Sequence, residues 1–199
     1  MPAVTCGLLA LSALCSILGL FGPWHITTAE RDDLKQRTEL GLWEVRSTGT
    51  MGTIVMAYEY WREICTDRVL DLSIWYDACV KPDIMRAFAI LAVLTALVAA
   101  SAASWAWRLP PAVPVPAAAA VALCCFLALA VAFTLEQVLP EPFVPRSDYN
   151  VSYWPGWGAA CEFIAMLSAI LAAVLFALRF ARSRAQAGGG TAPAIAVSA

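Results

Sequence analysis

Four long apolar runs, separated by polar stretches, dominate the pattern of residues along the chain. They cover about residues 4–21, 87–107, 117–135 and 157–178. Each is about 20 residues long, which is the length of helix needed to cross the hydrocarbon core of a bilayer. The runs are rich in leucine and alanine and do not alternate with polar residues, so they do not resemble barrel strands. We therefore predict an all-α membrane protein, a four-helix transmembrane bundle within residues 1–182.

The polar stretches between these runs predict the loops and the orientation. We expect outer loops over about 22–86 and 136–156, and a flexible cytoplasmic tail over 183–199. Basic residues gather beside the cytoplasmic ends of spans, and here they are Arg108 after the second run and Arg179, Arg182 and Arg184 after the fourth. Long loops translocate largely regardless of their charge, so the charged first loop does not oppose this assignment. Both termini are therefore predicted to be cytoplasmic.

The first outer loop has short alternating segments typical of strands. Apolar and polar residues alternate in parts of 40–46 and 53–60, and the turn-forming residues 47–50 lie between them. This pattern predicts an antiparallel hairpin, and hence a small extracellular β-rich cap built from the first loop. Residues 68–78 fit a strand or a short helix. The second span is expected to begin just after Pro82, with Asp83 favourable near the positive end of the helix dipole.

Composition agrees with a membrane protein. Of the 199 residues, 61% are hydrophobic and 14% are charged, more apolar surface than a soluble domain of this length could bury. The formal net charge of −2 gives no indication of nucleic-acid binding. The apolar composition makes the lipid bilayer the expected partner. The first run has no basic residue before it and ends in Gly-Pro-Trp, which predicts a retained span rather than a cleaved signal.

Two cysteines lie in the outer aqueous loop, where oxidation is permitted. They are Cys65 and Cys79, and the sequence predicts a disulfide between them, with two free thiols as the alternative.

Motifs for catalysis and for cofactors are missing from the sequence. It contains no CxxC, no HExxH and no phosphate-binding loop, and its one histidine lacks partners for a metal site. We therefore expect no enzyme activity, no cofactor, no metal and no small-molecule substrate.

Two further residues are singled out by their chemistry. Glu162 lies about one turn inside the fourth span, where a charge is costly unless it is protonated, hydrated or paired. We hypothesise a membrane-edge ion pair with Arg86, in which case Glu162→Gln should lower surface expression. Asn150 begins the glycosylation acceptor Asn-Val-Ser in the second outer loop, close to an interfacial tryptophan.

The layout then resembles a known family. A tryptophan (Trp24), a Gly41-Leu42-Trp43 segment, two loop cysteines and Arg86 at the start of the second span resemble the claudin, peripheral myelin protein and epithelial membrane protein superfamily. Residues 85–91 and 156–160 are similar to the starts of its second and fourth spans. The resemblance implies that Trp24, Gly41, Leu42, Trp43 and Arg86 place the cap. It also implies a non-enzymatic plasma-membrane protein that organises the cell surface or cell contacts through its first loop, by self-association or with another membrane protein.

Departures from the family pattern keep other interpretations open. Arg46 stands where the family has its first cysteine, and the chain ends without the tyrosine-valine type ending of many claudins. Amastin-type surface proteins share the layout and a similar entry to the second span. A paracellular ion barrier or channel using Glu44, Glu59 and Glu63, or an auxiliary subunit of a larger complex, are the remaining alternatives.

Overall fold

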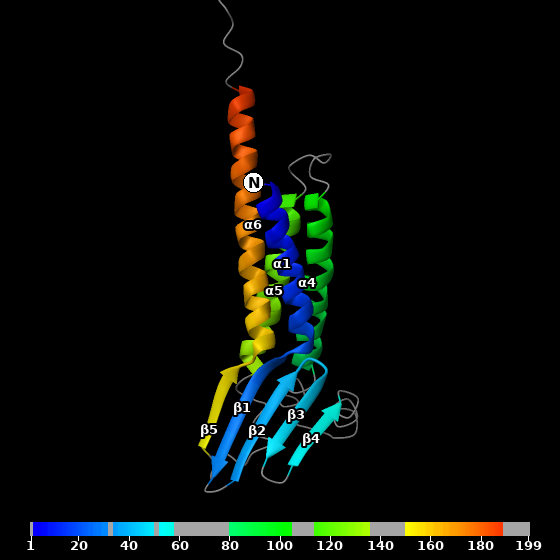
Figure 1. The fold of residues 1–199 in the computed structure, drawn as a ribbon, viewed down its shortest axis with the longest axis vertical. Coiled ribbons are helices and arrows are strands. Elements are labelled where there is room, and N and C mark those ends of the chain that lie inside the picture. Colours follow the sequence, from blue (N-terminus) through cyan, green and yellow to red (C-terminus); the bar gives the residue numbers. More distant parts are fainter. Residues whose placement is uncertain are drawn as a thin grey trace, which may run out of the picture.

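The computed structural model describes residues 2–31, 34–49, 52–57, 80–104, 114–135 and 150–188. Within these ranges a bundle of long helices carries an antiparallel sheet at one end (Figure 1). The predicted combination of a four-helix bundle and a small β-rich cap is confirmed.

Four helices in the described ranges are long and apolar enough to cross a membrane. They are α1 (Pro2–Phe21), α4 (Lys81–Ser104), α5 (Pro114–Leu135) and α6 (Trp157–Gly188). The main helix contacts join α1 to α4, α4 to α5, α5 to α6, and α6 back to α1. Consecutive helices therefore alternate in direction around a closed ring, and both α1 and α5 run towards the sheet.

Small residues fill the interior of the bundle, and large apolar residues cover its outside. On α4 the buried positions recur every three or four residues as alanines, from Ala89 to Ala103. Ser12 and Ser16 of α1 are fully buried in the same core, where Ser12 Oγ donates a 2.9 Å hydrogen bond to the carbonyl oxygen of Ala165. Small side chains let the helix backbones approach closely, which is how helices pack where the surroundings are as apolar as the core.

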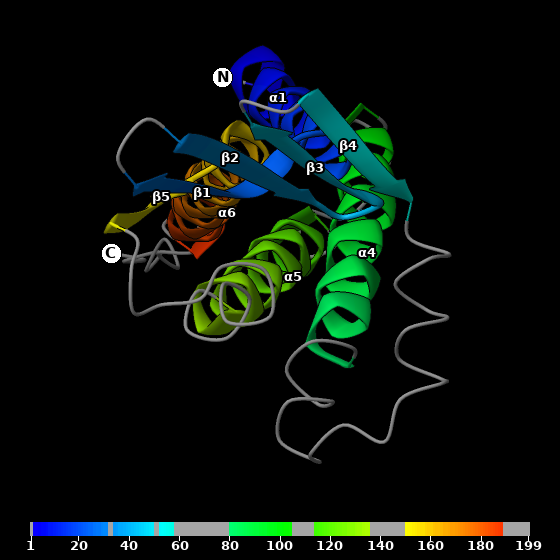
Figure 2. The ribbon, with the colours of Figure 1, turned by 90° about the horizontal axis from the view of Figure 1, so that it is seen from below.

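The sheet has five antiparallel strands in the order β4-β3-β2-β1-β5. They are β1 (Pro23–Arg31), β2 (Leu34–Gly41), β3 (Glu44–Gly49), β4 (Gly52–Ala57) and β5 (Asn150–Pro155). Seen from the sheet side in Figure 2, the strands lie across the ends of the helices. β1 follows directly from α1, and β5 leads directly into α6, so the sheet continues the bundle at two points.

The predicted hairpin is confirmed in its second half and corrected in its first. β3 pairs with β4 from Glu44↔Ala57 to Gly49↔Gly52, so the two segments do form a hairpin, but residues 47–49, which were expected in its turn, belong to β3. Leu40 and Gly41 instead end β2, and Leu42 and Trp43 form the turn between β2 and β3.

The cap is also larger than the first loop alone predicts. β5 comes from the stretch predicted to be the second outer loop and pairs with β1 from His25↔Pro155 to Glu30↔Asn150. The two loops expected to be separate therefore share one sheet.

The helix bounds differ modestly from the predicted spans. α4 begins at Lys81, so Pro82 lies in its first turn as expected. α6 continues to Gly188, so residues 183–188 of the expected flexible tail are helical. The expected strand or short helix over 68–78 lies outside the described residues.

Candidate functional site

The connection from α1 to β1 packs directly against the connection from β5 to α6. Gly156 and Gly158 permit this close approach, because a Cβ on Gly156 would lie 2.0 Å from the carbonyl oxygen of Pro23. A Cβ on Gly158 would lie 2.8 Å from the carbonyl oxygen of Gly22. Real Cβ atoms do not approach backbone this closely, so these positions require glycine. The segment that follows α1 and the segment that precedes α6 are thus joined at the helix ends by backbone contact.

Trp24 is the side chain around which this contact is built. It is fully buried, and its indole Nε1–H donates a 2.8 Å hydrogen bond to the carbonyl oxygen of Gly19. That carbonyl lies in the last turn of α1, where helices have no internal donor. On the other side, the Gly156 amide donates a 2.8 Å hydrogen bond to the carbonyl oxygen of Trp24. Trp24 therefore caps the end of α1 and holds the residue that precedes α6.

The Gly41-Leu42-Trp43 segment is the second point where the sheet is attached. Leu42 is 1% exposed and inserts into an apolar cluster formed by the sheet-side ends of the helices. The buried members of that cluster are Trp24, Leu42, Met85, Ala89, Ala128, Leu129, Ala132 and Ala159. Gly41 lies close to the next strand, since a Cβ there would be 3.2 Å from the carbonyl oxygen of Glu44.

Arg86 of α4 holds the backbone of this turn. Its Nε donates a hydrogen bond to the carbonyl oxygen of Leu42, and its Nη1 lies 2.6 Å from Asp83 Oδ1 in the first turn of α4. The guanidinium also lies over the ring of Trp43, 5.8 Å from its centroid. Arg86 thereby links the turn between β2 and β3 to the start of α4. Leu42, Trp43 and Arg86, which the family resemblance had singled out, thus lie together.

Three tryptophans beside the junction of sheet and helices are exposed. Trp43, Trp154 and Trp157 are 41%, 62% and 50% exposed. Amphipathic aromatic rings gather where a membrane meets water, so these residues suit that boundary.

Glu162 lies apart from this attachment, inside the bundle. Its side chain is fully buried, and neither carboxyl oxygen has a hydrogen-bond partner among the described residues. It faces Gly19 of α1, where a Cβ would lie 3.1 Å from Oε2, and its polar neighbours are Ser16 and Cys125. The expected ion pair of Arg86 with Glu162 is not formed, because Arg86 turns towards Leu42 and Asp83 at the sheet. A neutral carboxyl suits this place better than an unpaired carboxylate would.

The predicted glycosylation site lies on the sheet, whereas the predicted disulfide lies outside the described residues. Asn150 is the first residue of β5, opposite Glu30 of β1, and Ser152 of its acceptor motif lies 2.7 Å from the Thr28 hydroxyl, Oγ to Oγ1. Cys65 and Cys79, with the predicted disulfide, lie outside the described residues, as do Glu59 and Glu63.

Acidic groups of the described sheet are paired with bases. Glu30, Glu39 and Glu44 lie 2.6, 2.8 and 3.1 Å from the side-chain nitrogens of Lys35, Arg37 and Arg46. Within the described ranges no cluster of histidine, cysteine and acidic residues could hold a metal ion.

The glycines of the attachment were not predicted as a site. Gly22, Gly156 and Gly158 have no side chain whose chemistry could indicate a role, although residues 156–160 carried part of the family resemblance.

No protein-family model matches the chain, and no curated protein matches it.

Proposed function

We propose that this chain is a four-span integral membrane protein of claudin-like type that organises the cell surface or cell contacts through its sheet. In this proposal the sheet faces outward at the plasma membrane, both termini are cytoplasmic, and the protein is not an enzyme. The proposed partner is a second copy of the chain or another membrane protein.

The outer surface of the bundle supports the membrane placement. Large apolar side chains there are half exposed or more, including Leu94 at 54%, Val98 at 64% and Phe126 at 55%. Apolar area left in water costs about 25 cal/mol per Å², so a water-soluble bundle would turn these residues inward. Here alanine and serine are inside instead, which is the arrangement expected where lipid surrounds the helices.

The two ends of the bundle support the orientation. Trp43, Trp154 and Trp157 are exposed at the sheet end. Arg179 and Arg182 are exposed at the opposite end of α6. Arginines gather on the cytoplasmic side of spans, so the sheet end corresponds to the outside.

The observation that carries the functional part is the double attachment of the sheet. Trp24 and Leu42 are buried in the helix ends, and Gly156 joins the second loop to the first. Strands from both outer loops therefore form one sheet held in a fixed position on the bundle. A surface held in place before contact loses less conformational entropy on binding, which favours recognition of a partner.

The proposed disulfide and the alternatives depend on residues outside the described part of the chain. A Cys65–Cys79 bridge would staple the segment that follows β4. The ion-pathway alternative gains nothing from Glu44, which is already paired with Arg46. An amastin-like surface protein would share the same fold. An auxiliary subunit would co-purify with one fixed partner.

A mixed culture tests the proposal. Cells that are not adhesive by themselves, expressing the chain with a tag at its C-terminus, are grown with cells that lack it. Enrichment where two expressing cells touch is the expected result, and surface biotinylation in the same cells shows that the chain has reached the surface. A uniform distribution of chain that is fully biotinylated would overturn the cell-contact function.

A second tag tests the orientation independently. An epitope inserted between Gly49 and Gly52 should be accessible on intact cells, whereas a C-terminal tag should require permeabilisation. The reverse pattern would overturn the proposed topology.

A further inference from the structure

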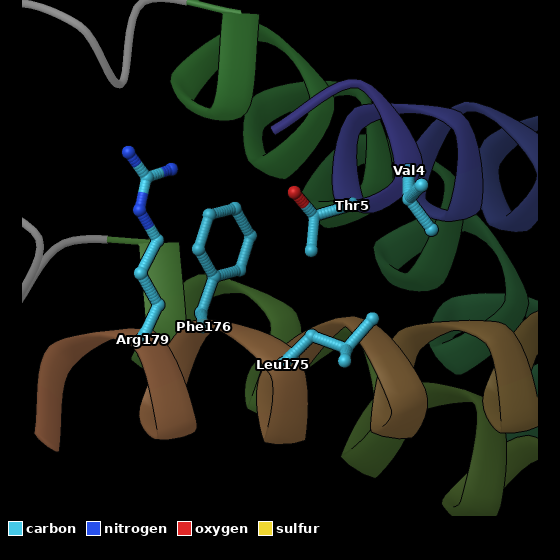
Figure 3. A pocket seen from close by; sticks show the side chains of 5 residues that line it. All are labelled: Val4, Thr5, Leu175, Phe176 and Arg179. Carbon is cyan, nitrogen blue, oxygen red and sulfur yellow. The ribbon is translucent and has the colours of Figure 1, made fainter. Parts of the chain in front are cut away.

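A pocket lies between α1 and α6 at the end of the bundle opposite the sheet. Its volume is about 200 Å³, and it is lined by Val4, Thr5, Leu175, Phe176 and Arg179. Figure 3 shows Arg179 and Phe176 side by side on α6, with the aromatic ring between Arg179 and Thr5 of α1. The pocket is therefore apolar along most of its wall and cationic at one edge.

The burial of the lining residues shows how the pocket is built. Phe176 and Thr5 are 6% and 5% exposed, so they form its inner wall. Val4 is 58% exposed, so the pocket is open beside α1 to the medium around the bundle. In the proposed membrane placement, on which this inference rests, that surrounding is the hydrocarbon of the lipid chains.

The depth of the pocket matches the inner edge of a bilayer. Arg179 is about 22 residues beyond Trp157, which corresponds to about 33 Å of helix. The hydrocarbon core is about 30 Å thick, so Arg179 lies at the level of the inner headgroups when Trp157 lies at the outer boundary. Leu175 and Phe176 then lie just inside the hydrocarbon.

The charge around the pocket has one sign. No acidic residue follows Glu162 in the sequence, and Arg179, Arg182 and Arg184 gather on the last part of α6. Arg179 forms no ion pair with the described residues. Arg184 instead lies over the ring of Phe180, 4.4 Å from its centroid. An unpaired guanidinium beside an apolar slot complements a molecule with a hydrocarbon tail and a negative head.

We propose that this pocket binds one acyl chain of an anionic phospholipid, with Arg179 contacting the phosphate-bearing headgroup. The tail lies against Leu175 and Phe176, and the open side at Val4 admits it from the bilayer. A site of this kind would bind the anionic lipids of the cytoplasmic leaflet to the α1–α6 interface.

Native mass spectrometry of the full chain in detergent micelles tests the site. The purified protein is mixed with phosphatidylserine or with phosphatidylcholine of the same acyl chains at equal concentration. We expect preferential retention of phosphatidylserine, and about a five-fold loss of that preference in Arg179→Gln. Arg182→Gln removes the same charge from the same helix end without touching the pocket, and it is expected to keep most of the preference.

A second variant tests the apolar slot separately from the charge. Val4→Trp adds a large side chain at an exposed position of the pocket, so the bundle core need not change, and it should reduce retention of both phospholipids. Equal retention of the two lipids by wild type, equal losses in Arg179→Gln and Arg182→Gln, or undiminished retention in Val4→Trp would each overturn the proposal.

The experiment distinguishes failure of this site from failure of the membrane placement. A chain that is not an integral membrane protein would leave the membrane fraction on alkaline carbonate extraction. A chain that stays in that fraction but shows no lipid preference refutes the lipid site alone.

Discussion

Arg86 donates a hydrogen bond from Nε to the carbonyl oxygen of Leu42, although 44 residues separate the two in the chain. Leu42 is buried among the helix ends, and the Arg86 side chain is 11% exposed, so the bond lies in a largely dry place. Hydrogen bonds to charged donors are stronger than neutral ones and are strengthened further where water is excluded. This contact attaches the turn between β2 and β3 to the N-terminal part of α4.

Loss of the guanidinium should loosen this attachment. Arg86→Gln removes the donor to the Leu42 carbonyl and the ion pair with Asp83, and we expect a loss of about 1–3 kcal/mol in unfolding free energy. Arg46→Gln is the matched control, because Arg46 pairs with Glu44 on the exposed sheet and surface pairs contribute about 0–1 kcal/mol. Unfolding in micelles, followed by tryptophan fluorescence, measures both. Equal stability of the two variants would refute the structural role of Arg86.

A methyl group on Gly156 should disrupt the contact between the two loops. Its Cβ would lie 2.0 Å from the Pro23 carbonyl oxygen, so Gly156→Ala must push β1 and the start of α6 apart. We expect a marked fall in Tm or in the yield of folded protein. Gly7→Ala is the control, because a Cβ there meets nothing within 4 Å. Alanine within a helix is favoured over glycine by about 0.5–1 kcal/mol, so that variant should be as stable as wild type or more stable. A Gly156→Ala protein as stable as wild type would contradict this packing.

The indole nitrogen of Trp24 should matter separately from its ring. Trp24→Phe keeps most of the buried aromatic surface but leaves the Gly19 carbonyl without its donor, for an expected cost of about 1–3 kcal/mol. Trp154→Phe removes an indole from a position that is 62% exposed and should cost little. Denaturant unfolding in mixed micelles compares the two. Equal stabilities would show that the hydrogen bond contributes nothing measurable.

The sequence predicted the four long helices because their signals are local. Long apolar runs determine the spans, and Pro82 marks the start of α4. The alternation in β3 and β4 revealed their hairpin, with the facing pair Gly49 and Gly52 next to its turn. Leu42 and Arg86 were selected by resemblance, and the structure places them in contact.

The features that the sequence did not predict, two strands and the direction of the Arg86 side chain, were missed for physical reasons. β2 reads Leu-Lys-Gln-Arg-Thr-Glu-Leu-Gly, and a strand with polar residues on both faces has no alternating pattern to detect. β5 pairs with β1 across a sequence separation that no local pattern reveals. Its Tyr153 and Trp154 have high strand propensity, which was the available signal. The direction of Arg86, towards the sheet rather than Glu162, depends on Leu42 being nearby, and that is a tertiary fact.

The predicted disulfide can be tested directly. Cys65 and Cys79 should resist a membrane-impermeant thiol reagent on intact cells until a reductant is added, because both lie in the predicted outer loop. The bridge would close a loop of about 13 residues, for which the chain-entropy model predicts about 3 kcal/mol of stabilisation. Cys65→Ser should therefore lower Tm and make Cys79 reactive without reductant, whereas Cys6→Ser, in α1, should do neither. Labelling of both loop cysteines before reduction would refute the bridge.

The structure reverses the expected effect of replacing Glu162. Because its carboxyl has no hydrogen-bond partner among the described residues, Glu162→Gln removes no contact and keeps the size of the side chain, and we expect surface expression at least equal to wild type. Glu162→Leu should be neutral or stabilising, since an apolar side chain avoids burying an unpaired polar group. A double-mutant cycle distinguishes this from the ion-pair hypothesis. With no contact between the two side chains, the effects of Glu162→Gln and Arg86→Gln on unfolding free energy should add within about 0.5 kcal/mol. A coupling well above that value, together with reduced expression of Glu162→Gln, would restore the ion pair.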